Sequence, residues 1–277
     1  MHFRLSFSIA LAMLALAALP ASAVASWSQH AVFQDDHNLL ERGDAARERT
    51  LDELRGLGVD VIKAQLSWSE VAPRGRKRPT GFVAADPAQY PGWARYDALV
   101  RDVQARGMSV MLALSPPYPG WATAKRGDRV GVDRPSPRAF GGFAEAAGRR
   151  YPSVGIWTIG NEPNHPGFLY PQATRRRVPF APHRYRGLVR EAVAGLRRSG
   201  HAGSTILFGE LLPIGKSRYF HKNTIKPLRF IREFFCLDSS WRAFRGRAAR
   251  LRGCQRYRPV TGVTGFAYHP YTRPNGP

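Results

Sequence analysis

The chain has 277 residues, of which 43% are hydrophobic and 22% are charged. Lys and Arg number 42 against 20 Asp and Glu, so the formal net charge is +22. This composition is that of a globular protein and excludes a disordered or collagen-like chain. No internal apolar run approaches the roughly 20 residues that a membrane-spanning helix needs, which excludes a multipass membrane protein.

The excess positive charge is mostly arginine and is spread along the whole chain. Basic clusters lie at residues 74–78, 175–177 and 242–258, and only 6 of the 42 basic residues are lysine. A nucleic-acid-binding surface would gather basic side chains with interleaved aromatics on one face. We therefore expect no nucleic-acid partner. Weak association with acidic polymers, such as those of a cell wall, is the more natural consequence of this charge.

The N-terminal segment 1–25 has the features of a secretory signal peptide. Arg4 provides a positive start, residues 5–19 are apolar, and a small-x-small cleavage pattern follows within 21–25. We expect cleavage there, a secreted, extracellular protein, and a folded domain over residues 26–277. An uncleaved membrane anchor is the alternative. The short apolar core argues against it, so no stable membrane insertion is expected.

Cys236 and Cys254 are the only cysteines. Export leads to an oxidising compartment, where a disulfide between them becomes possible. The segment between them, 237–253, is rich in arginine and poor in core residues, and a covalent closure would tether it. Two unrelated buried thiols are the alternative. No CxxC or HxxxH spacing occurs nearby, so we expect no metal site there.

Short β-branched and apolar runs alternate with amphipathic stretches, and glycine follows several of the latter, as at Gly58, Gly107 and Gly200. Such glycines typically end helices. The expected strands cover residues 30–34, 59–66, 108–114, 154–159, 204–208 and 263–268. The expected helices cover residues 44–57, 96–106, 137–150, 183–199 and 225–235.

The repeated strand–helix order predicts an α/β fold with a parallel sheet covered by helices. Long loops follow the strands, whereas tight glycine turns such as Leu57-Gly58 precede them. That asymmetry favours a (β/α)8 TIM barrel with its working face at the carboxyl ends of the strands. A Rossmann sheet is disfavoured because no GxGxxG follows the first strand. We place about six βα units, hence an incomplete barrel with unpaired edges at its first and sixth strands.

The most specific motif is VGIWTIGNEPN at residues 154–164. An apolar strand ends at Gly160, and Asn161 and Glu162 follow at its carboxyl end. A carboxylic acid placed there projects into the mouth of a barrel, where it can protonate a glycosidic oxygen. The neighbouring amide can hold a sugar hydroxyl. Glycoside hydrolysis needs such an acid together with a second carboxylate across the sugar.

This motif resembles the fourth-strand signature of the clan A glycoside hydrolases, which are retaining (β/α)8 enzymes, and families 5 and 39 are the most similar. The resemblance covers about residues 30–273. It implies a glycosidase that hydrolyses O-glycosidic bonds, of β configuration, in a carbohydrate substrate without a cofactor. It places the general acid/base on Glu162 and binding of the substrate 2-hydroxyl on Asn161. A second match, FAYHPY at 266–271, places His269 and Tyr271 beside the catalytic carboxylates.

Further candidates for substrate binding lie in loops that follow strands. Trp68 follows the second strand and Trp121 the third, and their rings could stack on a sugar or simply pack in a loop. Glu210 follows the fifth strand and could contact substrate or pair with an arginine. Residues 35–37, Asp-Asp-His, are weaker candidates after the first strand.

A retaining mechanism needs a nucleophile about 5 to 5.5 Å from the acid. In clan A this is a Glu that ends the seventh strand, and no residue here matches it. Glu210 and Glu70 are substitutes outside the family position. We therefore expect the nucleophile to be missing from this chain, which would then be a partial gene product.

Three other interpretations are compatible with the sequence. The first is a noncatalytic carbohydrate-binding barrel that uses Trp68, Trp121 and Asn161. The second is a basic structural protein associated with the cell wall, and the third is an inactive truncated gene product. Cellulose, mannan, xylan and a glucosylated glycolipid are all possible ligands, because loops rather than the fold set specificity.

Overall fold

A computed structural model describes residues 28–124, 131–216, 220–255 and 257–271. The chain divides into two units, 1–31 and 32–277, and only residues 28–31 of the first are described. The predicted signal peptide, residues 1–25, lies outside the described residues. Within the described ranges, no helix combines the length and the apolar character that crossing a membrane requires.

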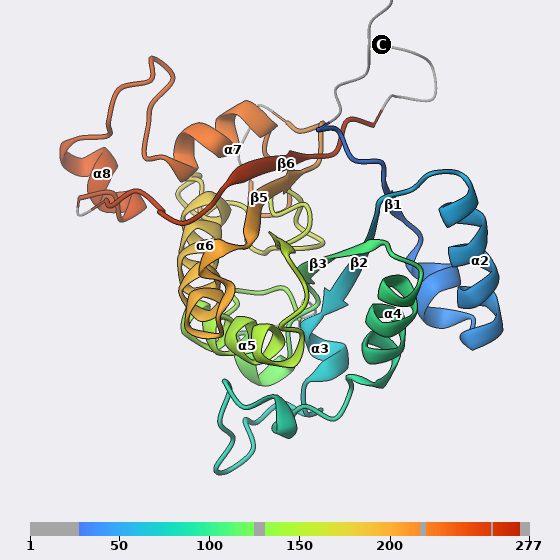
Figure 1. The fold of residues 1–277 in the computed structure, drawn as a ribbon. Helices are drawn as coiled ribbons and strands as arrows, with labels where there is room; N and C mark the ends of the chain where they lie inside the picture. Colours follow the sequence, from blue (N-terminus) through green and yellow to red (C-terminus); the bar gives the residue numbers. More distant parts are fainter. Residues whose placement is uncertain (1–27, 125–130, 217–219, 256, 272–277) are drawn as a thin grey trace, which may run out of the picture. The chain divides into compact units, whose positions relative to one another are not determined.

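Six parallel strands form one sheet, and their order in the sheet is their order in the chain (Figure 1). Helix-containing connections join consecutive strands. This arrangement confirms the predicted α/β fold with about six βα units of an incomplete (β/α)8 barrel. The strands are β1 (Val32–Gln34), β2 (Val61–Ser67), β3 (Ser109–Ser115), β4 (Ile156–Ile159), β5 (Thr205–Leu211) and β6 (Gly265–Tyr268).

All five predicted helices are present, each with ends within two residues of the prediction. They are α2 (Asp44–Gly56), α4 (Ala94–Ala105), α5 (Pro137–Arg150), α6 (Ala181–Arg198) and α7 (Pro227–Phe234). Helix α6 begins earlier than predicted because Pro182 occupies its first turn, a position where proline fits a helix. The structure adds α3 (Trp68–Val71), α8 (Gly246–Arg252) and the short helical turns η1 (His37–Glu41), η2 (Pro87–Gln89), η3 (Gly120–Ala122) and η4 (His201–Gly203).

Strand β2 shows how the sheet separates its two faces. Ile62, Ala64 and Leu66 are fully buried, whereas Lys63 and Gln65 between them are only partly buried. Side chains alternate across a strand, so the apolar set faces the helices and the polar set faces the barrel interior. The polar face thereby leads toward the carboxyl ends of the strands.

Helices α5 and α6 approach one another through glycine. A Cβ atom on Gly195 would lie 2.2 Å from the carbonyl oxygen of Gly141, and one on Gly141 would lie 2.8 Å from the carbonyl oxygen of Glu191. Any larger residue would push the helices apart. The close contact fixes these helices, which flank β4 along the chain.

Strands β1 and β6 each pair on one side only among the described residues. Their large side chains are correspondingly exposed: Val32 by 46%, Phe33 by 41%, Phe266 by 47% and Tyr268 by 44%. These are the unpaired edges expected from the sequence.

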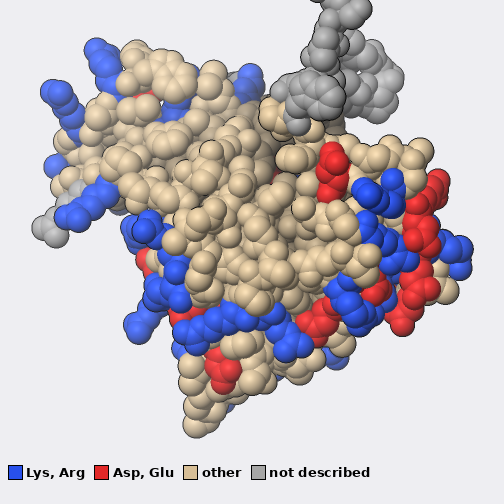
Figure 2. Space-filling model, viewed as in Figure 1, with Lys and Arg blue, Asp and Glu red and all other residues tan. Residues whose placement is uncertain are grey.

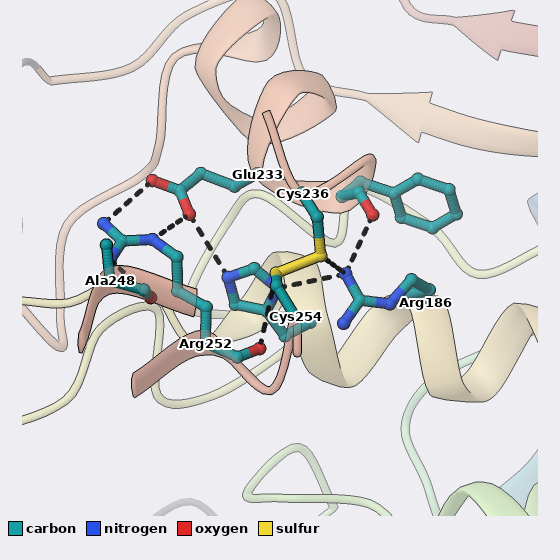
Figure 3. Close-up of a disulfide and its surroundings, with 8 residues drawn as sticks. Arg186, Glu233, Cys236, Ala248, Arg252 and Cys254 are labelled. Atoms are coloured by element: carbon teal, nitrogen blue, oxygen red, sulfur yellow. Dashed lines mark hydrogen bonds and ion pairs between the residues drawn. A yellow bond between two sulfur atoms is a disulfide. The ribbon is translucent and has the colours of Figure 1, made fainter. Parts of the chain in front are cut away.

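A disulfide joins Cys236, which follows α7, to Cys254, which follows α8. Figure 3 shows Arg186 of α6 pointing at this bond, and its Nη1 donates to Cys236 Sγ at 3.1 Å. Glu233 of α7 accepts a hydrogen bond from Arg252 of α8 at 2.7 Å. One covalent bond and several charged hydrogen bonds therefore hold the arginine-rich segment to α6 and α7.

His183 lies beside the disulfide, and its ring and the two sulfurs could be mistaken for a metal site, since their ligand atoms lie within 4.8 Å of one another. The sulfurs are bonded to each other. Arg186 Nη1 also lies 3.2 Å from His183 Nδ1 and can only donate to it. The Nε2–H of His183 therefore points to Glu233, and burial lowers the pKa of this histidine. The group holds no free thiolate for a metal.

The disulfide gives a first test of the fold. Replacing both residues, Cys236→Ser with Cys254→Ser, should lower the free energy of unfolding by about 2–4 kcal/mol, because the loop closed in the unfolded chain is lost. Urea denaturation measures this. A reducing agent should destabilise the native protein to a similar extent and leave the double variant unchanged, since the chain has no other cysteine. If reduction left the urea midpoint of the native protein unchanged, the disulfide would have no stabilising role.

Candidate active site

A pocket of about 640 Å³ opens at the carboxyl ends of the strands. Its walls come from β1 and β2 and from the loops that follow β1, β3, β4 and β6. This is the face on which the sequence places the site. The lining residues are Gln34, Asp36, Gln65, Pro116, Asn161, Glu162, Phe168, His269 and Tyr271.

Glu162 reaches the pocket through an unusual backbone turn after β4. Gly160 has φ of +85°, and Glu162 itself has φ of +41°. A left-handed conformation at a residue other than glycine costs about 1–3 kcal/mol and persists only where the surroundings impose it. Here the Glu162 N–H donates to the carbonyl of Glu210 at 2.9 Å, and the Gly160 N–H donates to Leu114 at 2.8 Å. These bonds fix Glu162, a residue that is only 9% exposed.

His269 joins two carboxyl groups that come from different strands. Its Nδ1 lies 2.9 Å from Oε1 of Glu162, and its Nε2 lies 2.9 Å from Oε2 of Glu210. Each ring nitrogen faces a carboxyl oxygen that accepts a hydrogen bond, so both nitrogens donate and the ring is positively charged. The bonds to Glu162 and Glu210 raise the pKa of His269 to about 9, although burial opposes this.

Glu210 lies beneath the pocket and is not among its lining residues. It is 1% exposed. Its Oε2 accepts from Lys63 Nζ at 2.6 Å, and its Oε1 accepts from Thr158 at 2.8 Å. Burial would raise the pKa of Glu210, but the His269 hydrogen bond, the charge and bond of Lys63 and the Thr158 bond outweigh it, so the pKa lies below its ordinary value. The charged partners of Glu210 are thus a histidine and a lysine. The sequence alone left open a contact with substrate or a pairing with an arginine.

Amide and carboxylate groups form the other wall of the pocket. Gln65 Nε2 donates to Asn161 Oδ1 at 3.3 Å. Asp36 accepts from the Gln65 backbone at 2.9 Å and from Gln34 Nε2 at 2.6 Å. Gln65 Oε1 is buried without a hydrogen-bond partner among the described residues. Such a wall offers donors and acceptors to a ligand that is rich in hydroxyl groups.

Tyr271 and Phe168 provide aromatic surface at the mouth of this polar pocket. Tyr271 is 63% exposed, and its hydroxyl lies 3.4 Å from His269 Nδ1. Phe168 is partly exposed in the loop after β4. The structure thus brings together four of the predicted site residues, Asn161, Glu162, His269 and Tyr271, in one pocket. Their roles stay predictions.

The two tryptophans do not belong to this pocket. Strand β2 ends at Ser67, and α3 turns Trp68 into the core, where it is 0% exposed and stacks on Phe143 with ring centroids 5.3 Å apart. Trp121 packs edge-on against Trp68 at 5.5 Å and donates from Nε1 to Pro73. Trp68 has no exposed face for a sugar, so its expected substrate contact is wrong. Trp121 packs in its loop, the alternative that the sequence left open.

Neither substitute for the nucleophile lines the pocket. Glu210 is enclosed by its own partners. Glu70 is half exposed on α3, where it pairs with Arg95 and accepts from the Tyr96 hydroxyl at 2.9 Å. The described residues therefore supply Glu162 and Asp36 as the carboxyl groups of the pocket walls.

Sequence reasoning missed the roles of Gln34, Lys63, Gln65 and Thr158. A signal for three of them was present. Lys63 and Gln65 interrupt the apolar run of β2 at a spacing of two residues, and polar residues at that period mark an interior face. Gln34 is the last residue of β1, where a polar side chain reaches the working face.

No protein-family model matches the chain, and no curated protein matches it. Among solved structures, it is similar to a family 39 glycoside hydrolase from the gut symbiont Bacteroides cellulosilyticus, at 15% identity and a TM-score of 0.41 over 65% of this chain. A family 1 β-glucosidase from Thermotoga maritima is similar at 18% identity and a TM-score of 0.43 over 62%. Fpglu1 from Fervidobacterium pennivoraus is similar at 17% identity and a TM-score of 0.44 over 63%.

The chain spans 31% to 45% of the length of these three structures. Two of them carry names of glycoside hydrolases, the group that the sequence motif resembles. The identities lie below 20% and the TM-scores below 0.5, so the function proposed below is based on the site residues alone.

The charge on His269 can be measured directly. An NMR titration of its ring Cε1 proton should give a midpoint near 9 rather than the ordinary 6.5. Since the folded-state pKa is raised, the stabilisation is complete below about pH 6.5 and is lost as the pH rises through about 9. The free energy of unfolding should fall across that window in the native protein and less in a His269→Gln variant. A midpoint near 6.5 would contradict the double hydrogen bond.

Proposed function

We propose that this chain carries the acid/base part of a secreted retaining glycoside hydrolase that cleaves O-glycosidic bonds, of β configuration, in a glycoside or polysaccharide. The observation that carries the proposal is the position of Glu162. Its Oε1 is bonded to His269, and Oε2 has no hydrogen-bond partner among the described residues. Oε2 is the oxygen that can exchange a proton with a ligand in the pocket.

In the proposed first step, Glu162 is a carboxylic acid that protonates the leaving glycosidic oxygen as its bond to the anomeric carbon breaks. In the second step, Glu162 is a carboxylate that takes a proton from the incoming water. Asn161, Gln65 and Asp36 hold sugar hydroxyl groups. The nucleophile would be a Glu on a strand beside β6, and the described residues contain no such strand.

An external anion can take the place of that carboxylate in a test. Azide attacks the anomeric carbon of an aryl β-glycoside, the carbon–oxygen bond breaks with its electron pair on oxygen, and Glu162 donates the proton. Glu162→Gln should lower azide-dependent release of phenol from phenyl glycosides by about 10²–10⁴-fold, the usual contribution of general acid catalysis. Release of 2,4-dinitrophenol, which leaves without protonation, should change little. Chromogenic release across gluco-, manno- and xylosides measures this.

Glu53→Gln provides a matched control. Glu53 is exposed on α2, so this substitution removes the same charge outside the pocket. It should behave like the native protein. Saturable glycoside binding without any azide-dependent product would refute the proposed glycosidase activity. It would favour the alternative, a noncatalytic carbohydrate-binding barrel. The absence of both binding and turnover would favour an inactive product.

We also propose that the arginine-rich segment closed by the disulfide associates with acidic cell-wall polymers after export. Arg242, Arg245, Arg247 and Arg250 are exposed, and Asp238 is the only acidic residue between the two cysteines. In Figure 2 the charged side chains on the side that carries α8 are mainly blue, whereas the side that carries α2 mixes blue with red. An acidic polysaccharide therefore meets less repulsion at α8.

Replacing these four arginines with alanine should weaken binding to polygalacturonate about fourfold or more, because exposed ion pairs contribute about 0.2–1 kcal/mol each. Biolayer interferometry at two salt concentrations measures this. The control replaces Arg42, Arg49, Arg55 and Arg101, which are equally exposed but lie on α2, α4 and the preceding turn. Equal weakening by both sets would show that net charge alone acts.

A further inference from the structure

Glu210 occupies a buried position in a backbone conformation that a strand does not favour. The register between β5 and β6 shifts between Gly209 and Leu211, so Glu210 is the extra residue of a bulge. Its φ is +49°, in the left-handed region. Bulges re-aim a side chain, and strain of this kind gathers at functional sites. The bulge turns the Glu210 side chain inward, beneath the pocket.

Three donors from three different strands satisfy this carboxylate. Lys63 comes from β2, Thr158 from β4 and His269 from the end of β6. A buried charge is costly unless it is paired and hydrogen-bonded. Lys63 supplies the compensating charge, so Glu210 is ionised and can hold a proton on the facing nitrogen of His269.

Glu210 is connected to Glu162 by two routes. One route is His269, whose two nitrogens contact the two carboxyl groups. The other is the backbone, where the Glu162 N–H donates to the Glu210 carbonyl at 2.9 Å. The backbone N–H of His269 in turn donates to the backbone carbonyl of Leu211, the residue after Glu210, at 3.0 Å. The bulge of β5 therefore sets both the ring and the turn that aim Glu162.

We propose that Glu210 is a positioning residue that holds His269 as a double donor against Glu162, so that one oxygen of Glu162 is occupied and the other faces the pocket. The proposal deepens the glycosidase function proposed above and rests on it for its catalytic consequence. Its structural content concerns only the charge and orientation of His269, and this can be measured without any substrate.

The charged and titratable groups that face His269 are Glu162 after β4, Glu210 in β5, Lys63 in β2 and Tyr271 after β6. Lys63 and His269 both donate to Oε2 of Glu210. In Glu210→Gln the amide oxygen at that position can still accept from both, but the negative charge is gone. The NMR midpoint of His269 should then fall by about 1 to 3 pH units, the usual effect of removing an adjacent opposite charge.

A second variant covers the case in which Glu210→Gln fails to fold because the charge of Lys63 is left buried without a compensating negative charge. The double variant Lys63→Met with Glu210→Gln removes both charges, and replacing a whole buried pair is often tolerated. Its His269 midpoint should fall as well. An unchanged midpoint in both variants would overturn the proposal.

Glu233→Gln is a matched control. Glu233 is also 1% exposed and lies between a histidine, His183, and a cation, Arg252. It is remote in chain position from β5 and contacts no pocket residue that the structure describes. The His269 midpoint should stay near 9 in this variant. A fall equal to that in Glu210→Gln would overturn the assignment to Glu210.

The azide assay separates positioning from a merely structural role. Glu210→Gln should lower kcat for phenyl glycosides about tenfold or more, leave KM nearly unchanged, and affect 2,4-dinitrophenyl glycosides much less, because only proton donation by Glu162 is impaired. An equal loss on both substrates would contradict positioning. If the native protein gives no azide-dependent product, the glycosidase function fails, whereas the His269 titration still decides the role of Glu210.

Discussion

The parallel alignment of all six strands decides which side chains can meet in this protein. Because every strand runs in the same direction, the carboxyl ends of β2, β4, β5 and β6 lie at one edge of the sheet. Glu162, Glu210 and His269 converge there from distant parts of the chain, and Lys63 reaches Glu210 from within β2. The resulting network alternates positive and negative groups, so Glu162 and Glu210 each have a cationic partner in a protein with a net charge of +22.

Much of the fold follows from the sequence because its signals are local. Apolar runs of strand length and glycine stops such as Gly58 and Gly107 locate the strands and the long helices. The helices that escaped prediction lack such a signal. Helix α3 is a single turn of four residues, too short for a helical period, and α8 buries only Ala249, so it has no apolar stripe to recognise.

The site was predictable only in part, for related reasons. Glu162 and Asn161 stand out because they follow an apolar strand that ends in glycine. Trp68 misled because the chain leaves β2 for α3 just before it, which rotates the ring into the core. The partners of Glu210 could not be read from sequence, since they depend on a left-handed residue in a bulge that no local pattern announces.

In the network of Lys63, Glu210, His269 and Glu162, the residue that the sheet supports least is His269. His269 follows β6, which pairs with β5 alone among the described residues and exposes nearly half of Phe266 and Tyr268. Glu162 instead follows β4, and Glu210 lies in β5, and both of these strands are paired on both sides. The position of the imidazole ring therefore depends on the pairing of β6 with β5 alone. A strand that paired with the open side of β6 would hold His269 more firmly and would thereby act on the carboxyl group of Glu162 from a distance.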